Sequence, residues 1–109
     1  MKKIKLAEAT VDNNEMDALA SWIKTYPKLT KGPLTVSFEE KWSSYIGVKH
    51  STFVNSGSSA NLIMLAALLE GGDLEVGDSV VVPSLSWATD LAPVMQLGLN
   101  PGIVTGKRR

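Results

Sequence analysis

A short turn rich in serine and glycine, VNSGSSANL at residues 54–62, separates a β-type run from a long apolar segment. A turn between a strand and a helix presents free backbone N–H groups at the positive end of the helix dipole, where anions such as phosphate bind. Ser58 and Ser59 add hydroxyl donors, and Gly57 lets a ligand approach the backbone closely. The same stretch is also compatible with an ordinary helix cap at Ser56 or Ser58. It contains neither the P-loop pattern nor the dinucleotide-binding glycine pattern.

Composition and charge argue against several classes of partner. The 109 residues carry 11 Lys and Arg, 11 Asp and Glu, and no cysteine. Without net charge the chain has no general attraction for nucleic acid or anionic membranes, and without cysteine it forms no disulfide. The basic N-terminus lacks the apolar region of a signal peptide, and no apolar run is long enough to span a bilayer. We therefore expect a cytoplasmic protein with no nucleic-acid, membrane or metal partner; His50 is expected at the surface.

Two helices are predicted in the first half of the chain. Apolar residues recur at helical spacing over 13–25 and again over 34–46, separated by a loop rich in proline and glycine. The expected boundary signals are Asp12 or Asn13 and Pro27 for the first helix, and Gly47 for the end of the second. Ser37 and Glu40 are expected to form a capping box inside the first turns of the second helix.

The second half alternates between strand-like and helical segments, which predicts an α/β fold. The helix at 58–69 is apolar nearly all round and is expected to be buried. The β-branched run at 79–82 does not alternate, so it is expected to be covered on both faces. A last helix with Asp90 as N-cap would place Pro93 in its first turn, where proline is tolerated. We expect residues 51–54 and 79–82 to be neighbours in one parallel or mixed sheet, with a third strand beginning at Pro101.

Several sequence motifs follow one another in a recognisable order. LTKGP at residues 29–33 is followed by VKH, NSGSSANL, VGDSVVVPSLSWAT and finally QLGLNP, which ends at Pro101. In this order the motifs resemble the N-terminal part of the DegT/DnrJ/EryC1/StrS sugar aminotransferases, which use pyridoxal 5′-phosphate (PLP). The resemblance implies the large domain of the aspartate-aminotransferase type, a three-layer fold with a mixed sheet. Residues 1–109 would form the N-terminal part of that domain, with the chain departing from the family after about residue 101.

The resemblance also assigns roles to individual residues. Gly57, Ser58 and Ser59 match the turn that holds the cofactor phosphate, and Trp87 matches the aromatic residue that stacks on the pyridine ring. Without the resemblance, Trp87 would be interpreted as a core tryptophan between a strand and a helix. The family implies a nucleotide-linked keto sugar and an amino donor as substrates. Its sites lie at a dimer interface, so a homodimer is expected.

The family's catalytic lysine and its acidic partner for the pyridine nitrogen lie downstream of residue 109, so no catalytic residue is predicted and the isolated chain is expected to be inactive. The ending GIVTGKRR also differs from the family, which is typical of a truncated or frame-shifted segment. Two alternatives stay open. One is the branch with histidine in place of lysine, which dehydrates the sugar at C3; the other is a non-catalytic segment that binds phosphate or dimerises.

Overall fold

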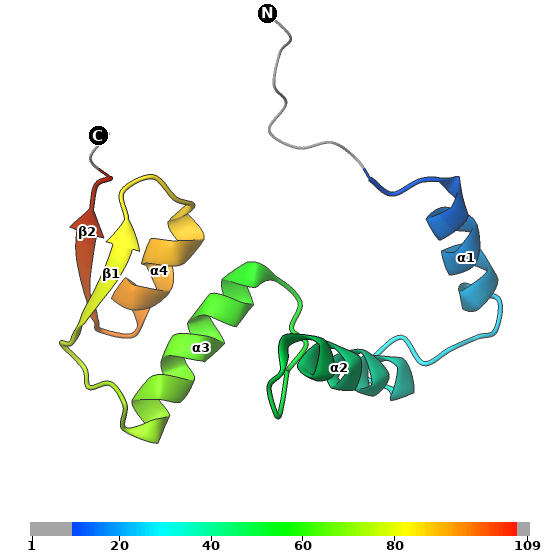
Figure 1. Ribbon diagram of the computed structural model, residues 1–109, viewed down its shortest axis with the longest axis horizontal. Helices are drawn as coiled ribbons and strands as arrows, with labels where there is room; N and C mark the ends of the chain where they lie inside the picture. Colours follow the sequence, from blue (N-terminus) through cyan, green and yellow to red (C-terminus); the bar gives the residue numbers. More distant parts are fainter. Residues whose placement is uncertain (1–9, 107–109) are drawn as a thin grey trace, which may run out of the picture. The chain divides into compact units, whose positions relative to one another are not determined.

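The chain forms two compact units, which divide between Ser51 and Thr52 (Figure 1). The computed structural model describes residues 10–106. The first unit contains two helices, and the second contains two helices and a two-stranded parallel sheet. The predicted α/β class is therefore confirmed, and the sheet lies entirely in the second unit. Within the described range, no helix is long and apolar enough to cross a membrane.

Helix α1 (Asn13–Ile23) begins with a capping box formed by Asp12 and Glu15. The Asp12 side chain accepts a hydrogen bond from the Asn14 N–H at 2.7 Å, and the Asp12 N–H donates to Glu15 Oε2 at 2.9 Å. Hydrogen bonding with Glu15 and from the Asn14 N–H lowers the pKa of the Asp12 carboxyl group. Of the two predicted N-cap residues, Asp12 is therefore the one that caps α1, and Asn13 is the first residue of the helix.

Helix α2 (Pro33–Ile46) starts at a proline, and its N-cap Gly32 provides no side-chain cap. The predicted capping box was wrong, because Pro33 is preorganised for the first helical position and starts the helix before Ser37. The predicted end is confirmed: Gly47 has a φ of 75°, in the left-handed region where glycine is favoured.

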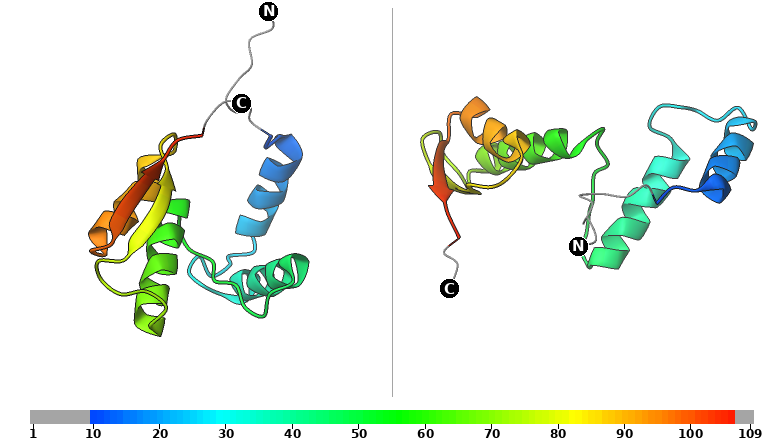
Figure 2. Two further views of the ribbon diagram at one scale, coloured as in Figure 1. Left: turned by 60° about the vertical axis from the view of Figure 1, so that its left-hand side comes forward. Right: turned by 90° about the horizontal axis from the view of Figure 1, so that it is seen from above.

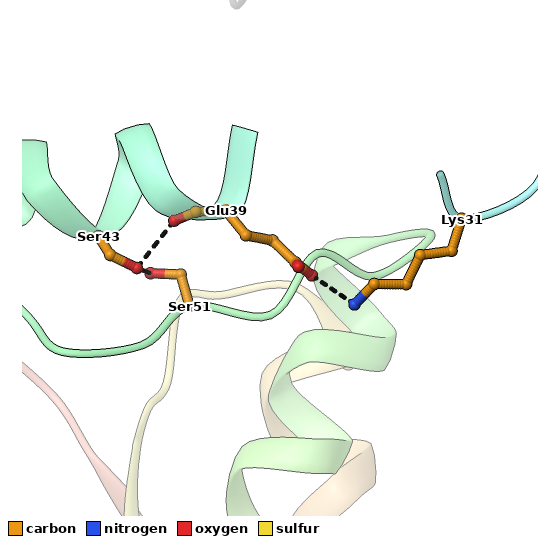
Figure 3. Close-up of polar contacts among 4 residues, drawn as sticks. All are labelled: Lys31, Glu39, Ser43 and Ser51. Atoms are coloured by element: carbon orange, nitrogen blue, oxygen red, sulfur yellow. Dashed lines mark hydrogen bonds and ion pairs between the residues drawn. The ribbon is translucent and has the colours of Figure 1, made fainter. Parts of the chain in front are cut away.

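A buried serine ties α2 to the segment that follows it. Ser43 Oγ lies 2.8 Å from the Glu39 carbonyl oxygen and 2.9 Å from Ser51 Oγ (Figure 3). Lys31, in the loop before α2, pairs with the Glu39 side chain of that helix, with Nζ 3.1 Å from Oε1. Ser43 is buried, and its hydroxyl group is satisfied by hydrogen bonds as burial requires.

The second unit is built from α3 (Gly57–Gly71), β1 (Ser79–Pro83), α4 (Ala88–Gln96) and β2 (Asn100–Val104). Strands β1 and β2 are parallel, with Ser79 opposite Asn100 and Pro83 opposite Val104, and α4 connects them (Figure 2). Helix α4 contacts both strands and α3. Four apolar side chains form the core of the unit: Leu65, Val82, Val94 and Leu99.

Three expectations for the second half of the chain were wrong. Residues 51–54 form no strand, because no strand of the described chain hydrogen-bonds to them. Strand β1, their expected neighbour, pairs with β2 instead. In β1, Val82 faces the core, but Val81 is 68% exposed, so only one face of the strand is covered. Helix α3 buries only Leu65, because α4 is the one element of the described residues that packs extensively against it.

The start of α4 also differs from expectation. Trp87, and not Asp90, is the N-cap, so Pro93 lies inside the helix rather than in its first turn. Pro93 is nevertheless buried in the core region, and the Leu97 N–H donates to its carbonyl oxygen at 3.1 Å. A proline at this position leaves one carbonyl oxygen of the first turn without its helical donor.

Candidate cofactor-phosphate site

The serine- and glycine-rich turn forms the N-terminus of α3. Ser56 is the N-cap, and its Oγ accepts the Ser59 N–H at 3.1 Å, which confirms the capping interpretation for Ser56. The cap uses the N–H of Ser59, whereas the N–H groups of Gly57 and Ser58 have no hydrogen-bond partner within residues 10–106. The turn therefore combines a conventional cap with two free donors at the positive end of a 15-residue helix.

The surroundings of these donors are open. Gly57 and Ser58 are both exposed, and a Cβ atom added to Gly57 would meet no atom within 4 Å. Ser59 is half-buried. An anion can therefore reach the two free N–H groups and the Ser58 hydroxyl group without any displacement of protein atoms. This arrangement has the donors, the dipole and the access that a phosphate group needs.

Trp87 lies at the other predicted site position. It follows the carboxyl end of β1 through a short loop, in which Ser86 Oγ donates to the Pro83 carbonyl oxygen at 3.1 Å. The indole is 77% exposed, so Trp87 is not a core residue of the described chain. Ligands of open α/β sheets bind outside the carboxyl ends of the strands, which is where Trp87 stands.

One asparagine links the two site positions. Asn61 Nδ2, on α3, donates to the Thr89 carbonyl oxygen at 3.2 Å and to Asp90 Oδ1 at 3.0 Å, both in the first turn of α4. The N-terminal halves of α3 and α4 are consequently side by side (Figure 2). The serine- and glycine-rich turn begins α3, and Trp87 is the N-cap of α4. Sequence reasoning missed Asn61; the signal was Pro93, whose missing N–H creates the demand for a donor at Thr89.

His50 is exposed and belongs to the first unit. Across residues 10–106, no group of three or more His, Cys, Asp or Glu side chains is placed to hold a metal ion.

Comparison with known proteins extends over nearly the whole chain. Residues 10–107 match the DegT/DnrJ/EryC1/StrS aminotransferase family. The GDP-4-keto-6-deoxy-D-mannose 3-dehydratase of Yersinia pseudotuberculosis is 38% identical over 102 residues, which are 92% of this chain and 26% of that protein. The GDP-perosamine synthase of Caulobacter vibrioides is 31% identical over 109 residues, 100% of this chain and 28% of the synthase.

A solved structure shows the same likeness in three dimensions. The crystal structure of GDP-4-keto-6-deoxymannose-3-dehydratase with a trapped PLP-glutamate geminal diamine superposes with a TM-score of 0.79 at 35% identity, covering 94% of this chain and 27% of that one. The chain thus spans about a quarter of the length of the relatives it matches. The predicted fold, a part of the PLP-dependent aminotransferase type, is confirmed by this superposition. The chain belongs to the DegT/DnrJ/EryC1/StrS aminotransferase family.

Proposed function

We propose that residues 1–109 form the N-terminal part of the large domain of a PLP-dependent enzyme that acts on a nucleotide-linked keto-deoxy sugar. In this proposal Gly57, Ser58 and Ser59 hold the cofactor phosphate and Trp87 covers one face of its pyridine ring. The observation that carries the proposal is the Asn61 bridge, because it joins α3, which begins at the Gly57 and Ser58 N–H donors, to the first turn of α4, whose N-cap is the exposed Trp87. Relatives that bind PLP or act on GDP-linked sugars support it.

The residues present fit the cofactor. The Gly57 and Ser58 N–H groups and the Ser58 hydroxyl group supply donors for a phosphate, and the space beside Gly57 is open. The exposed Trp87 indole offers a flat apolar surface on which an aromatic ring can stack and be shielded from water on one side. PLP, when bound, supplies an electron sink for chemistry next to an amine. The role of this chain is to bind and orient that group.

Two reactions are candidates for the complete enzyme. Amino transfer from glutamate to the keto sugar is the reaction expected from the family as a whole. Dehydration at C3 is favoured by a specific observation: the Yersinia 3-dehydratase is 38% identical to this chain, against 31% for the Caulobacter perosamine synthase. Both reactions would use the same phosphate turn and the same ring-stacking residue, so the assignment of the site does not depend on the choice.

We further propose that the chain associates as a homodimer. Helix α3 is apolar on nearly every side, yet Ile63 and Met64 are each more than half exposed. Exposed apolar surface of this kind is typical of an interaction surface. A second copy is the partner that the family implies.

The phosphate site is tested by serine replacement. Ser58→Ala removes one donor to a charged group, which is worth about 1.5–3 kcal/mol, so the Kd for inorganic phosphate and for PLP should rise by about ten- to a hundred-fold. Ser79→Ala is the matched control, because Ser79 is also exposed but lies at the amino end of β1. Isothermal titration calorimetry of both variants decides the matter. Equal affinities for Ser58→Ala and Ser79→Ala would remove the phosphate site.

A further inference from the structure

Pro93 creates a demand that helix α4 cannot meet by itself. In an α-helix, the carbonyl oxygen of Thr89 would accept the N–H of residue 93, but proline has no N–H. Thr89 is half-buried, and a buried carbonyl group without a donor is destabilising. The carbonyl oxygen therefore needs a donor from another element.

Asn61 provides this donor from α3. Its side-chain amide nitrogen carries two hydrogens, and the two acceptors that it meets, the Thr89 carbonyl oxygen and Asp90 Oδ1, account for both. Because neither acceptor has a hydrogen to donate as a carbonyl or carboxylate, the nitrogen and not the oxygen of the amide must face them. The pair of bonds thus joins α3 and α4 at one defined register.

From this bridge we infer that Asn61 is a positioning residue, which sets the spacing between the phosphate turn and Trp87 so that one ligand can contact both. The inference rests on the proposed function. The phosphate donors stand at the start of α3, one turn before Asn61, and Trp87 is the N-cap immediately before the helical turn that Asn61 holds. No side chain of the bridge needs to touch the ligand, because its effect is transmitted through the relative placement of the two helix starts.

The bridge itself is tested by a double-mutant cycle in the 109-residue chain. Asn61→Ala should lower the folding equilibrium constant by about ten-fold, since two hydrogen bonds to half-buried groups are lost. Pro93→Ala supplies an N–H to the Thr89 carbonyl oxygen. In the Pro93→Ala chain, the decrease in the folding equilibrium constant caused by Asn61→Ala should therefore be about five-fold smaller than in the wild-type chain. Asn13→Ala, at the exposed start of α1, is the control for an asparagine replacement and should show no such dependence on Pro93.

If Asn61→Ala alone does not fold, the cycle still gives an answer. A folded Asn61→Ala/Pro93→Ala chain would support the bridge, because the restored N–H compensates for the missing amide. An unfolded double variant alongside a folded Pro93→Ala chain would overturn it. Urea unfolding followed by circular dichroism measures the stability of the four chains of the cycle, which are the wild type, the two single variants and the double variant, and of the Asn13→Ala control with and without Pro93→Ala.

The positioning role is tested by comparing two ligands. Asn61→Ala should leave the Kd for inorganic phosphate within about two-fold, because the turn at 56–59 is local, but should weaken PLP binding by about five-fold. In a Trp87→Ala background, Asn61→Ala should cause no further loss of PLP affinity, since the residue that it positions is gone. Weakening that is equal for phosphate and PLP, or that persists without Trp87, would show a general structural role and overturn the inference.

These outcomes separate the inference from the proposed function. A wild-type chain that binds neither phosphate nor PLP would overturn the proposed function and the positioning role together. The double-mutant cycle on folding would then still test the Asn61 bridge by itself. A chain that binds PLP normally but shows no coupling between Asn61 and Pro93 would retain the proposed function and overturn the inference.

Discussion

Replacing Gly57 by alanine should raise stability and lower phosphate affinity at the same time. Gly57 is the first residue of α3, its φ is not positive, and an added Cβ would meet no atom within 4 Å. Alanine is therefore compatible with the native backbone, and it restricts the unfolded chain. A compatible replacement of this kind stabilises by about 0.4–1 kcal/mol. The first helical position gains less than the helix interior, so we expect a rise in Tm of about 2–4 °C.

The effect on the ligand has the opposite sign. The open space beside Gly57 is the space through which a phosphate oxygen would approach its free N–H, and the new methyl group occupies part of it. Loss of that charge-assisted bond is worth about 1.5–3 kcal/mol, or about ten- to a hundred-fold in Kd. A turn that served only as a helix cap would show the stability gain with no effect on phosphate.

Gly71→Ala is the matched control, because Gly71 is the last residue of the same helix. An added Cβ there would lie 3.6 Å from Asp73 Oδ2, an ordinary contact distance. It should stabilise the helix by a similar amount and leave phosphate binding unchanged. Thermal unfolding by circular dichroism and calorimetric titration with inorganic phosphate are carried out on both variants. Unchanged phosphate affinity in Gly57→Ala, with Tm raised in both, would refute the phosphate assignment.

Two further predictions concern packing and association. Val94 is 1% exposed, so Val94→Ala should cost about 1.5–3 kcal/mol in urea unfolding, whereas Val81→Ala at an exposed position should cost much less; similar costs would contradict the described core. The exposed apolar faces of α3 predict that the chain sediments as a dimer, and a monomer at every accessible concentration would argue against this association.

Helix positions were predictable from sequence because their signals are local. Periodic apolar residues and boundary residues such as Asp12 and Gly47 act within a few positions of one another, and the structure places them as predicted. The start of α2 shows the limit of such signals. Pro33, which was assigned to the preceding loop, is the first residue of α2 because its fixed φ suits the first helical turn, and the Ser37–Glu40 pattern lies inside the helix, where it caps nothing.

Sheet pairing and burial depend on distant residues, and here the sequence was less informative. The run at 51–54 has strand composition, but a strand also needs a hydrogen-bonding neighbour, and β1 takes β2 as its partner. The apolar texture of α3 correctly predicted a helix, but the prediction that the helix is buried was wrong. How much of it is covered depends on which elements pack against it, and in the described chain that is chiefly α4.

The site shows both kinds of information within one motif. Ser56 caps the helix, Gly57 and Ser58 leave their N–H groups free in the first turn, and Asn61 reaches α4 from the following turn. The first three are local features and could be predicted. The role of Asn61 depends on Pro93, which lies more than thirty residues away in the sequence. Because Pro93 has no N–H, the Thr89 carbonyl oxygen needs another donor, and only the packing of α3 against α4 shows that Asn61 provides it.

Because the start of the motif leaves N–H groups free and Asn61 contacts α4, the order of residues in the motif matters as well as its composition. Each residue added to an α-helix turns the next side chain by about 100°, as 3.6 residues complete a turn. One residue inserted between Ser59 and Asn61 would keep the cap and both free donors but would turn the asparagine amide away from Thr89. The phosphate turn would survive, while its registration with Trp87 would be lost. The spacing from Ser56 to Asn61 therefore satisfies two requirements at once, an open helix start and a fixed neighbour.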